Sequence, residues 1–207
     1  NKKENHWINN GLKTYWEIQY LEKFYKDYKL LGNLIDYKIL GIKPLKYSFF
    51  SKLNLSERYG LAYQYIMAQN LDQKIDENLE SLSNFNEIAI SKFETGTLLN
   101  FISEKMGKDN FDNFVRDYIA KNDNKLINKE DFLNEMAMKS GYSSSFMETY
   151  IQRKMRVNFK IKSFDRIDDQ LHIKISKNTT QNIPFKLKTE DSKGEEKTYW
   201  YDTNNKK

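Results

Sequence analysis

The sequence contains no cysteine. This absence excludes disulfide bonds, thiol nucleophiles, cysteine-ligated zinc and iron–sulfur clusters together. Histidine is nearly as scarce, because His6 and His172 are the only two and they lie at opposite ends of the chain. No H-E-x-x-H pair is present, so this chain alone cannot build a histidine-rich metal site.

Long hydrophobic runs are also missing. No apolar run approaches the roughly 18 residues that a membrane-spanning helix needs, and no signal-like apolar segment follows the polar start. We therefore expect a soluble chain with no membrane-spanning segment, in a compartment that the sequence does not indicate. The start at Asn1 without an initiator methionine suggests a processed product or a piece of a longer protein.

The charge balance is only mildly basic. Lys and Arg number 34 against 29 for Asp and Glu, which gives a net charge of +5 over 207 residues. No single basic block stands out in the sequence. Because nucleic-acid sites need clustered cations to displace counterions, we expect no nucleic-acid partner.

What the sequence does contain is typical of a globular protein, with 39% hydrophobic and 14% aromatic residues and few Gly or Pro. Apolar residues at three- and four-residue steps predict a series of helices. A segment over residues 32–54 has no such period, and we expect it to be an ordered connection that packs on the core. The predicted helices cover about residues 7–31, 54–70, 84–106, 109–121, 129–139 and 143–156.

At Val157 the hydrophobic period changes from 3.6 to 2. Apolar and polar residues then alternate over residues 157–162, 171–176 and 185–188, which is typical of strands with one wet face. A turn is predicted at residues 192–194, before the last strand. We therefore expect a mainly α fold, with a helical domain over residues 1–156 and a small antiparallel β module over residues 157–207.

Three segments, in order, resemble motifs of one enzyme family. Residues 7–15 read W-I-N-N-G-L-K-T-Y, and residues 93–96 read F-E-T-G ahead of an apolar helix and M-G-K-D-N-F. Residues 128–132 read N-K-E-D-F, followed by S-G at 140–141. These resemble the W-L-N-E-G, Y-E-K-G, L-G-x-x-x-F, T-x-x-D-F and S-G segments of the M1 zinc aminopeptidases, gluzincins with a thermolysin-like domain. The resemblance covers residues 7–156.

The resemblance implies a zinc site that this sequence alters. In the family, zinc is held by two His of an H-E-x-x-H helix, which this chain lacks, and by the Glu of W-L-N-E-G. That Glu position falls on Asn10, whose neutral amide compensates less of the zinc charge. The family Tyr that donates a proton to the tetrahedral oxyanion falls on Phe93, which keeps the ring and loses the donor.

Three hypotheses follow. The first is that the chain is the C-terminal part of an M1-like metallopeptidase, a hydrolase whose amino-terminal remainder would be its partner; alone it should neither bind zinc tightly nor cleave a peptide substrate. The second is a degenerate, non-catalytic scaffold, a pseudoenzyme that binds peptides or a protein partner. The third is a stand-alone helical adaptor, in which Asn10 and Phe93 do not converge on a common cleft.

Each candidate residue also has a structural explanation. Asn10 is of a residue type that often bonds backbone donors at a helix start, and Phe93 would by default be a core aromatic. His6 lies just before the first predicted helix, in a terminus that we expect to be flexible. The helical spacing of the aromatic residues between Trp7 and Tyr28 indicates packing rather than a stacking platform.

Overall fold

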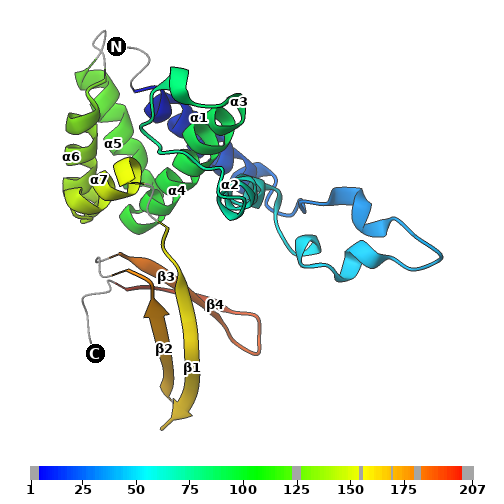
Figure 1. Ribbon diagram of the computed structural model, residues 1–207. Coiled ribbons are helices and arrows are strands. Elements are labelled where there is room, and N and C mark those ends of the chain that lie inside the picture. Colours follow the sequence, from blue (N-terminus) through cyan, green and yellow to red (C-terminus); the bar gives the residue numbers. More distant parts are fainter. Residues whose placement is uncertain (1–4, 123–126, 154–155, 169, 180–182, 202–207) are drawn as a thin grey trace. The chain divides into compact units, whose positions relative to one another are not determined.

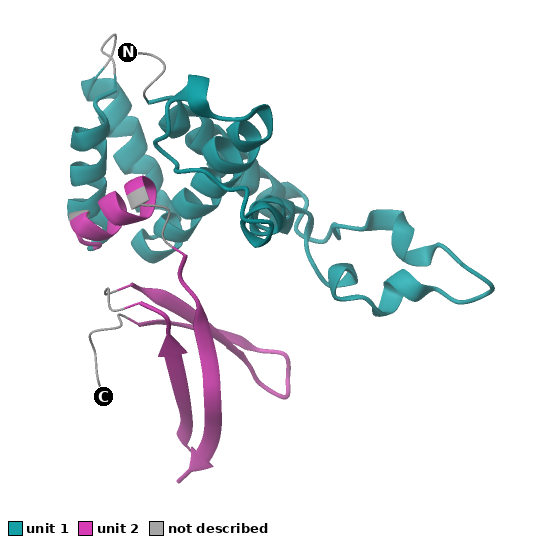
Figure 2. Cartoon of the chain, viewed as in Figure 1, with its two compact units in different colours: residues 1–141 teal, residues 142–207 magenta. Residues whose placement is uncertain are grey.

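The structure is a computed structural model that describes residues 5–122, 127–153, 156–168, 170–179 and 183–201. As the sequence predicts, the chain is mainly helical and ends in a small antiparallel β module (Figure 1). It divides into two compact units, Asn1–Gly141 and Tyr142–Lys207 (Figure 2). Within the described residues, no helix is both long and apolar enough to cross a membrane.

The first unit contains six α-helices and one π-helix among its described residues. They are α1 (His6–Phe24), α2 (Arg58–Ala68), α3 (Asn84–Asn86), the π-helix η6 (Glu87–Glu94), α4 (Thr95–Met106), α5 (Lys108–Lys121) and α6 (Lys129–Ser140). In the described part of this unit, five short 3-10 turns lie between α1 and α3: η1 (Gly32–Asp36), η2 (Pro44–Tyr47), η3 (Phe49–Ser51), η4 (Leu55–Glu57) and η5 (Leu79–Ser81).

The helix ends follow local capping signals in the sequence. The Asn128 side chain accepts hydrogen bonds from the backbone N–H groups of Glu130 and Asp131, at 2.9 and 3.4 Å, and so caps α6. Gly141 ends the same helix in a left-handed conformation, with φ of 70°. Ahead of α2, the Glu57 carboxylate accepts from the Asn54 backbone N–H at 2.5 Å.

Residues 29–54, which we call the arm, contradict two expectations. The first helix ends at Phe24 and not near Leu31, and apart from the buried Leu53 at its base the arm does not pack on the core. Most of its large apolar side chains are exposed, and Figure 1 shows the segment leaving α1 and returning to α2 as a projection from the first unit. The physical reason is that three separate 3-10 turns give the arm no continuous apolar face to bury.

The first unit is organised around a close crossing of α1 and α4. A Cβ atom placed on Gly11 would lie 2.4 Å from the Cγ2 atom of Thr95. One placed on Gly96 would lie 2.5 Å from the Cβ atom of Thr14 and 3.3 Å from the carbonyl oxygen of Gly11. Any larger residue at either position would therefore push the two helices apart.

Aromatic rings carry the core from this crossing into α5 and α6. Tyr15 of α1 meets Phe111 edge-on at 4.8 Å between ring centroids. Phe114 and Tyr118 of α5 both contact Phe132 of α6, at 5.6 and 5.2 Å. All five side chains are buried, and their contacts hold α5 and α6 in place against α1.

The second unit begins with α7 (Ser144–Arg153) and continues into two hairpins. Strand β1 (Phe159–Ile167) pairs with β2 (Gln170–Lys177), and β3 (Phe185–Glu190) pairs with β4 (Glu196–Tyr201), both antiparallel. The predicted turn at 192–194 is present, with Gly194 at φ of 82°. The two compact units divide before Tyr142, whereas the change from helix to strand falls between α7 and β1. The predicted domain boundary at 157 stays a prediction.

The strands are wetter than the alternating pattern predicts. Ile161, Phe164 and Leu171 are 55%, 72% and 55% exposed, so β1 and β2 do not have one dry face. A register irregularity between Ile161 and Ser163 keeps Ile161 opposite Ile175 and Phe164 opposite Ile173. The two hairpins meet through Phe159 and Phe185, whose rings lie 4.9 Å apart.

The helix crossing predicts opposite effects for one substitution at two helical glycines. Gly11→Ala should lower the free energy of unfolding by about 1–3 kcal/mol, because the new methyl group collides with Thr95. Gly60→Ala in α2 meets no atom within 4 Å and should be neutral or stabilise by up to about 1 kcal/mol. Urea unfolding of both variants measures the difference; equal stabilities would contradict the close crossing.

Candidate functional site

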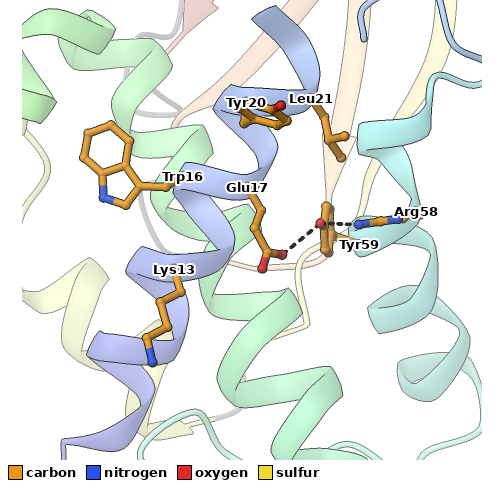
Figure 3. Close-up of a pocket in the computed structure, with 7 residues that line it drawn as sticks. All are labelled: Lys13, Trp16, Glu17, Tyr20, Leu21, Arg58 and Tyr59. Atoms are coloured by element: carbon orange, nitrogen blue, oxygen red, sulfur yellow. Dashed lines mark hydrogen bonds between the residues drawn. The ribbon is translucent and has the colours of Figure 1, made fainter. Parts of the chain in front are cut away.

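A pocket of about 550 Å³ lies between α1 and α2. Its walls combine aromatic and aliphatic side chains with charges of both signs. The lining residues are Lys13, Trp16, Glu17, Tyr20 and Leu21 of α1 and Arg58 and Tyr59 at the start of α2. Figure 3 shows Glu17 pointing from α1 toward Tyr59, while Arg58 reaches the same phenol oxygen from α2.

A hydrogen-bonded chain joins the two helices at this pocket. The Tyr59 hydroxyl donates to the Glu17 carboxylate at 2.9 Å and accepts from the Arg58 guanidinium at 2.6 Å (Figure 3). The guanidinium also lies over the Tyr59 ring, 4.7 Å from its centroid. Tyr59 is buried while Glu17 and Arg58 are exposed, so the phenol connects the core to two charges that face solvent.

The environment of Tyr59 holds its phenol in the neutral form. Burial raises the pKa of Tyr59 above its ordinary value, and the hydrogen bond to Glu17 raises it further, while the bond from Arg58 acts in the opposite direction. Throughout the neutral pH range, the Tyr59 hydroxyl therefore stays protonated and donates its hydrogen bond to the Glu17 carboxylate.

Asn10, which the sequence resemblance aligns with a zinc-ligand Glu, lies on α1 beside η6. Its side-chain amide donates to the Ser91 hydroxyl at 2.8 Å. Ser91 is fully buried, so the bond satisfies a polar group that has no access to solvent. Asn10 is thus not a helix cap: α1 begins four residues earlier, at His6, and the amide bridges two helices.

Phe93, which the sequence resemblance aligns with an oxyanion-stabilising Tyr, lies two residues beyond Ser91 on η6. Its ring packs edge-on against Tyr59, with centroids 5.1 Å apart. Neither Phe93 nor Asn10 lines the pocket itself. They are connected to it, because Phe93 supports the Tyr59 wall and Asn10 lies on the helix that carries Lys13 and Glu17.

The residues around Asn10 do not fit a zinc ion by themselves. The amide and the Ser91 hydroxyl are both neutral, whereas zinc sites use His, Cys or carboxylate ligands. In the described part of the chain no three His, Asp or Glu side chains are placed so that they could share a metal. His6 is buried at the start of α1, which contradicts the flexible terminus expected for it.

The aromatic residues of α1 contradict the expectation that they pack. Only Trp7 and Tyr15 are buried in the core. A line of exposed rings runs from the pocket along the end of α1, with Tyr20 and Phe24 4.9 Å apart and Tyr25 and Tyr28 5.2 Å apart. Helical spacing alone could not reveal this, because the line lies where α1 ends and its core partners stop.

Sequence reasoning missed the pocket residues. One signal was present: the capping pair Asn54 and Glu57 places Arg58 and Tyr59 at the first turn of α2. Nothing in the sequence shows that this turn lies beside Glu17, because the arm separates the two helices along the chain.

The comparisons with known proteins add no relative. Neither the scan against protein-family models nor the search of curated proteins finds a match for this chain. A function is therefore inferred from the motifs in residues 7–156 and from the contacts of Asn10, Phe93 and the pocket residues.

The raised pKa of Tyr59 predicts a loss of stability in alkali. Its neutral form is favoured in the folded state, so its contribution is complete below about pH 10, the ordinary tyrosine value, and is lost as the pH rises through the higher folded pKa. Tyr59→Phe should cost about 0.5–1.5 kcal/mol at neutral pH and should flatten the alkaline fall in unfolding free energy.

The matched control is Tyr65→Phe, on the same helix at an exposed position. It should change neither the stability at neutral pH nor the alkaline slope. Urea unfolding at neutral and alkaline pH measures both quantities, and an alkaline slope in Tyr59→Phe that equals that of the unaltered chain would contradict the assignment.

Proposed function

We propose that this chain is part of an M1-like metallopeptidase unit, the part that follows the zinc-binding helix, and that alone it neither binds zinc tightly nor hydrolyses peptides. One observation carries the proposal. The segments that resemble W-L-N-E-G and Y-E-K-G pack directly on each other through their glycines, Gly11 and Gly96. Two segments that are far apart in the sequence thus lie in contact in the fold, which is a condition for a site that both of them share.

In this proposal, the side chains of Asn10 and Phe93 explain why the chain alone does not hydrolyse peptides. The amide of Asn10 is committed to Ser91, and the ring of Phe93 has no hydroxyl to donate. Peptide hydrolysis at such a site needs a polarising metal or a general base, together with a donor for the oxyanion. Loss of one oxyanion donor alone typically costs about 10²–10³ in rate.

A second function, the degenerate peptide-binding scaffold, is favoured by the pocket. Lys13 and Arg58 suit the carboxylates of a peptide, Glu17 suits an amine, and Trp16 and Tyr20 offer apolar contact. In this case binding would persist without hydrolysis even in a protein that contains an intact H-E-x-x-H helix.

Zinc content and aminoacyl-amide hydrolysis test the first function. The purified chain should hold less than one zinc per molecule and should show no hydrolysis that a chelator abolishes. In a longer protein that contains the upstream H-E-x-x-H helix, Asn10→Glu should raise zinc affinity, because a carboxylate restores the anionic third ligand.

The control is Asn9→Glu, which adds the same carboxylate one residue earlier, on the exposed side of α1. It should leave zinc affinity unchanged. Chelator-sensitive hydrolysis by the unaltered chain, or equal zinc affinities of the two Glu variants, would overturn the assignment of Asn10. Peptide binding without hydrolysis in the longer protein would select the second function.

A further inference from the structure

The arm, residues 29–54, ends in an apolar tip that the described chain leaves in solvent. Ile39 and Ile42 form a tight reversal, with backbone hydrogen bonds of 2.8 and 3.0 Å between them. Leu40 at its apex is 97% exposed, and Ile39 and Ile42 are 54% and 64% exposed. Such a cluster of aliphatic side chains at the end of a projection indicates an interaction site.

Leu40 also has an unfavourable backbone conformation. Its φ is 50° and that of Gly41 is 80°, the left-handed pair that two-residue turns normally fill with Asn-Gly or Gly-Gly. A leucine at such a position is strained, and its exposed side chain recovers nothing by packing within the described chain. The apolar side chain at the apex is therefore not explained by the folding of the arm.

The net positive charge of the chain lies mostly in the same segment. The arm contains five lysines and one acidic residue, a net charge of +4, while the whole chain has +5. Although no single basic block stands out in the sequence, most of the positive excess therefore lies in the arm. Lys38, Lys46 and Lys52 are exposed, while Lys43 pairs with Asp36 at 2.6 Å.

Exposed aromatic residues lie in sequence between the tip and the base of the arm. Tyr37, Tyr47 and Phe49 are 64%, 82% and 66% exposed. Tyrosine is enriched where a protein crosses the headgroup level of a bilayer, because its ring is apolar and its hydroxyl is polar. The base is fixed by backbone bonds from Leu30 to Leu53 and from Leu55 to Tyr28, each 2.9 Å.

We propose that the arm binds the surface of an anionic lipid bilayer, with Ile39, Leu40 and Ile42 entering the acyl boundary and the exposed lysines contacting the headgroups. Burial of the aliphatic tip in the acyl boundary and the attraction of the exposed lysines to anionic headgroups both favour binding. The binding is peripheral and reversible. It is independent of the peptidase proposal, because the arm shares no residue with the pocket.

Co-sedimentation with vesicles tests the proposal. The full chain should bind vesicles that contain phosphatidylglycerol, should bind pure phosphatidylcholine weakly, and should release as salt screens the lysines. Leu40→Ser should lower partitioning about tenfold, which corresponds to the burial of one leucine side chain. Met138→Ser, at a 77% exposed position on α6, is the matched control and should change nothing.

A second readout does not depend on the size of the affinity. Because the chain has no cysteine, Leu40→Cys accepts a single polarity-sensitive dye, whose emission should shift to the blue on anionic vesicles; the dye at Met138→Cys should not shift. Equal binding by Leu40→Ser and the unaltered chain would overturn the proposal. So would an unshifted dye at position 40, or a Leu40→Ser effect on self-association or on DNA binding that needs no vesicles.

Discussion

The approach of α1 to α4 at Gly11 and Gly96 is the constraint on which the first unit depends. Because neither residue has a side chain, the backbones lie close enough for Thr14 and Thr95 to fill the crossing. This contact sets the depth of α1 in the core, brings Asn10 within hydrogen-bond distance of Ser91, and places Glu17 on the side of α1 that meets α2. The polar network and the pocket therefore both depend on the close approach of α1 and α4 at these two glycines.

Much of the fold could be predicted where local chemistry decides it. Asn128 and Gly141 delimit α6 because a side-chain cap and a left-handed glycine act within a few residues of the chain. The change of period at Val157 gives the strands for the same reason. The π-helix over residues 87–94 could not be predicted, because its apolar spacing differs little from that of an α-helix and its stability comes from packing on α1 and α2.

The arm and the pocket depend on partners that are distant in sequence, which explains why sequence reasoning failed there. Periodicity identifies an apolar residue but does not say whether a neighbour covers it, so Tyr20 and Leu40 were indistinguishable from core residues. Asn10 and Phe93 were found through a resemblance, and the structure gives them packing roles: a bridge to Ser91 and a support for Tyr59.

The helix crossing can be measured directly because the chain has no native cysteine. A Cβ atom on Gly11 would lie 3.0 Å from that of Thr95, whereas the Cβ atoms of a disulfide lie about 3.8 Å apart. In the pair Gly11→Cys and Thr95→Cys, the two helices therefore need to move apart by less than about 1 Å for the disulfide to form. On mild oxidation this double variant should lose both free thiols within the monomer, whereas Gly60→Cys with Thr95→Cys should keep them. Two free thiols in the first pair after oxidation would contradict the crossing, and with it the site built on it.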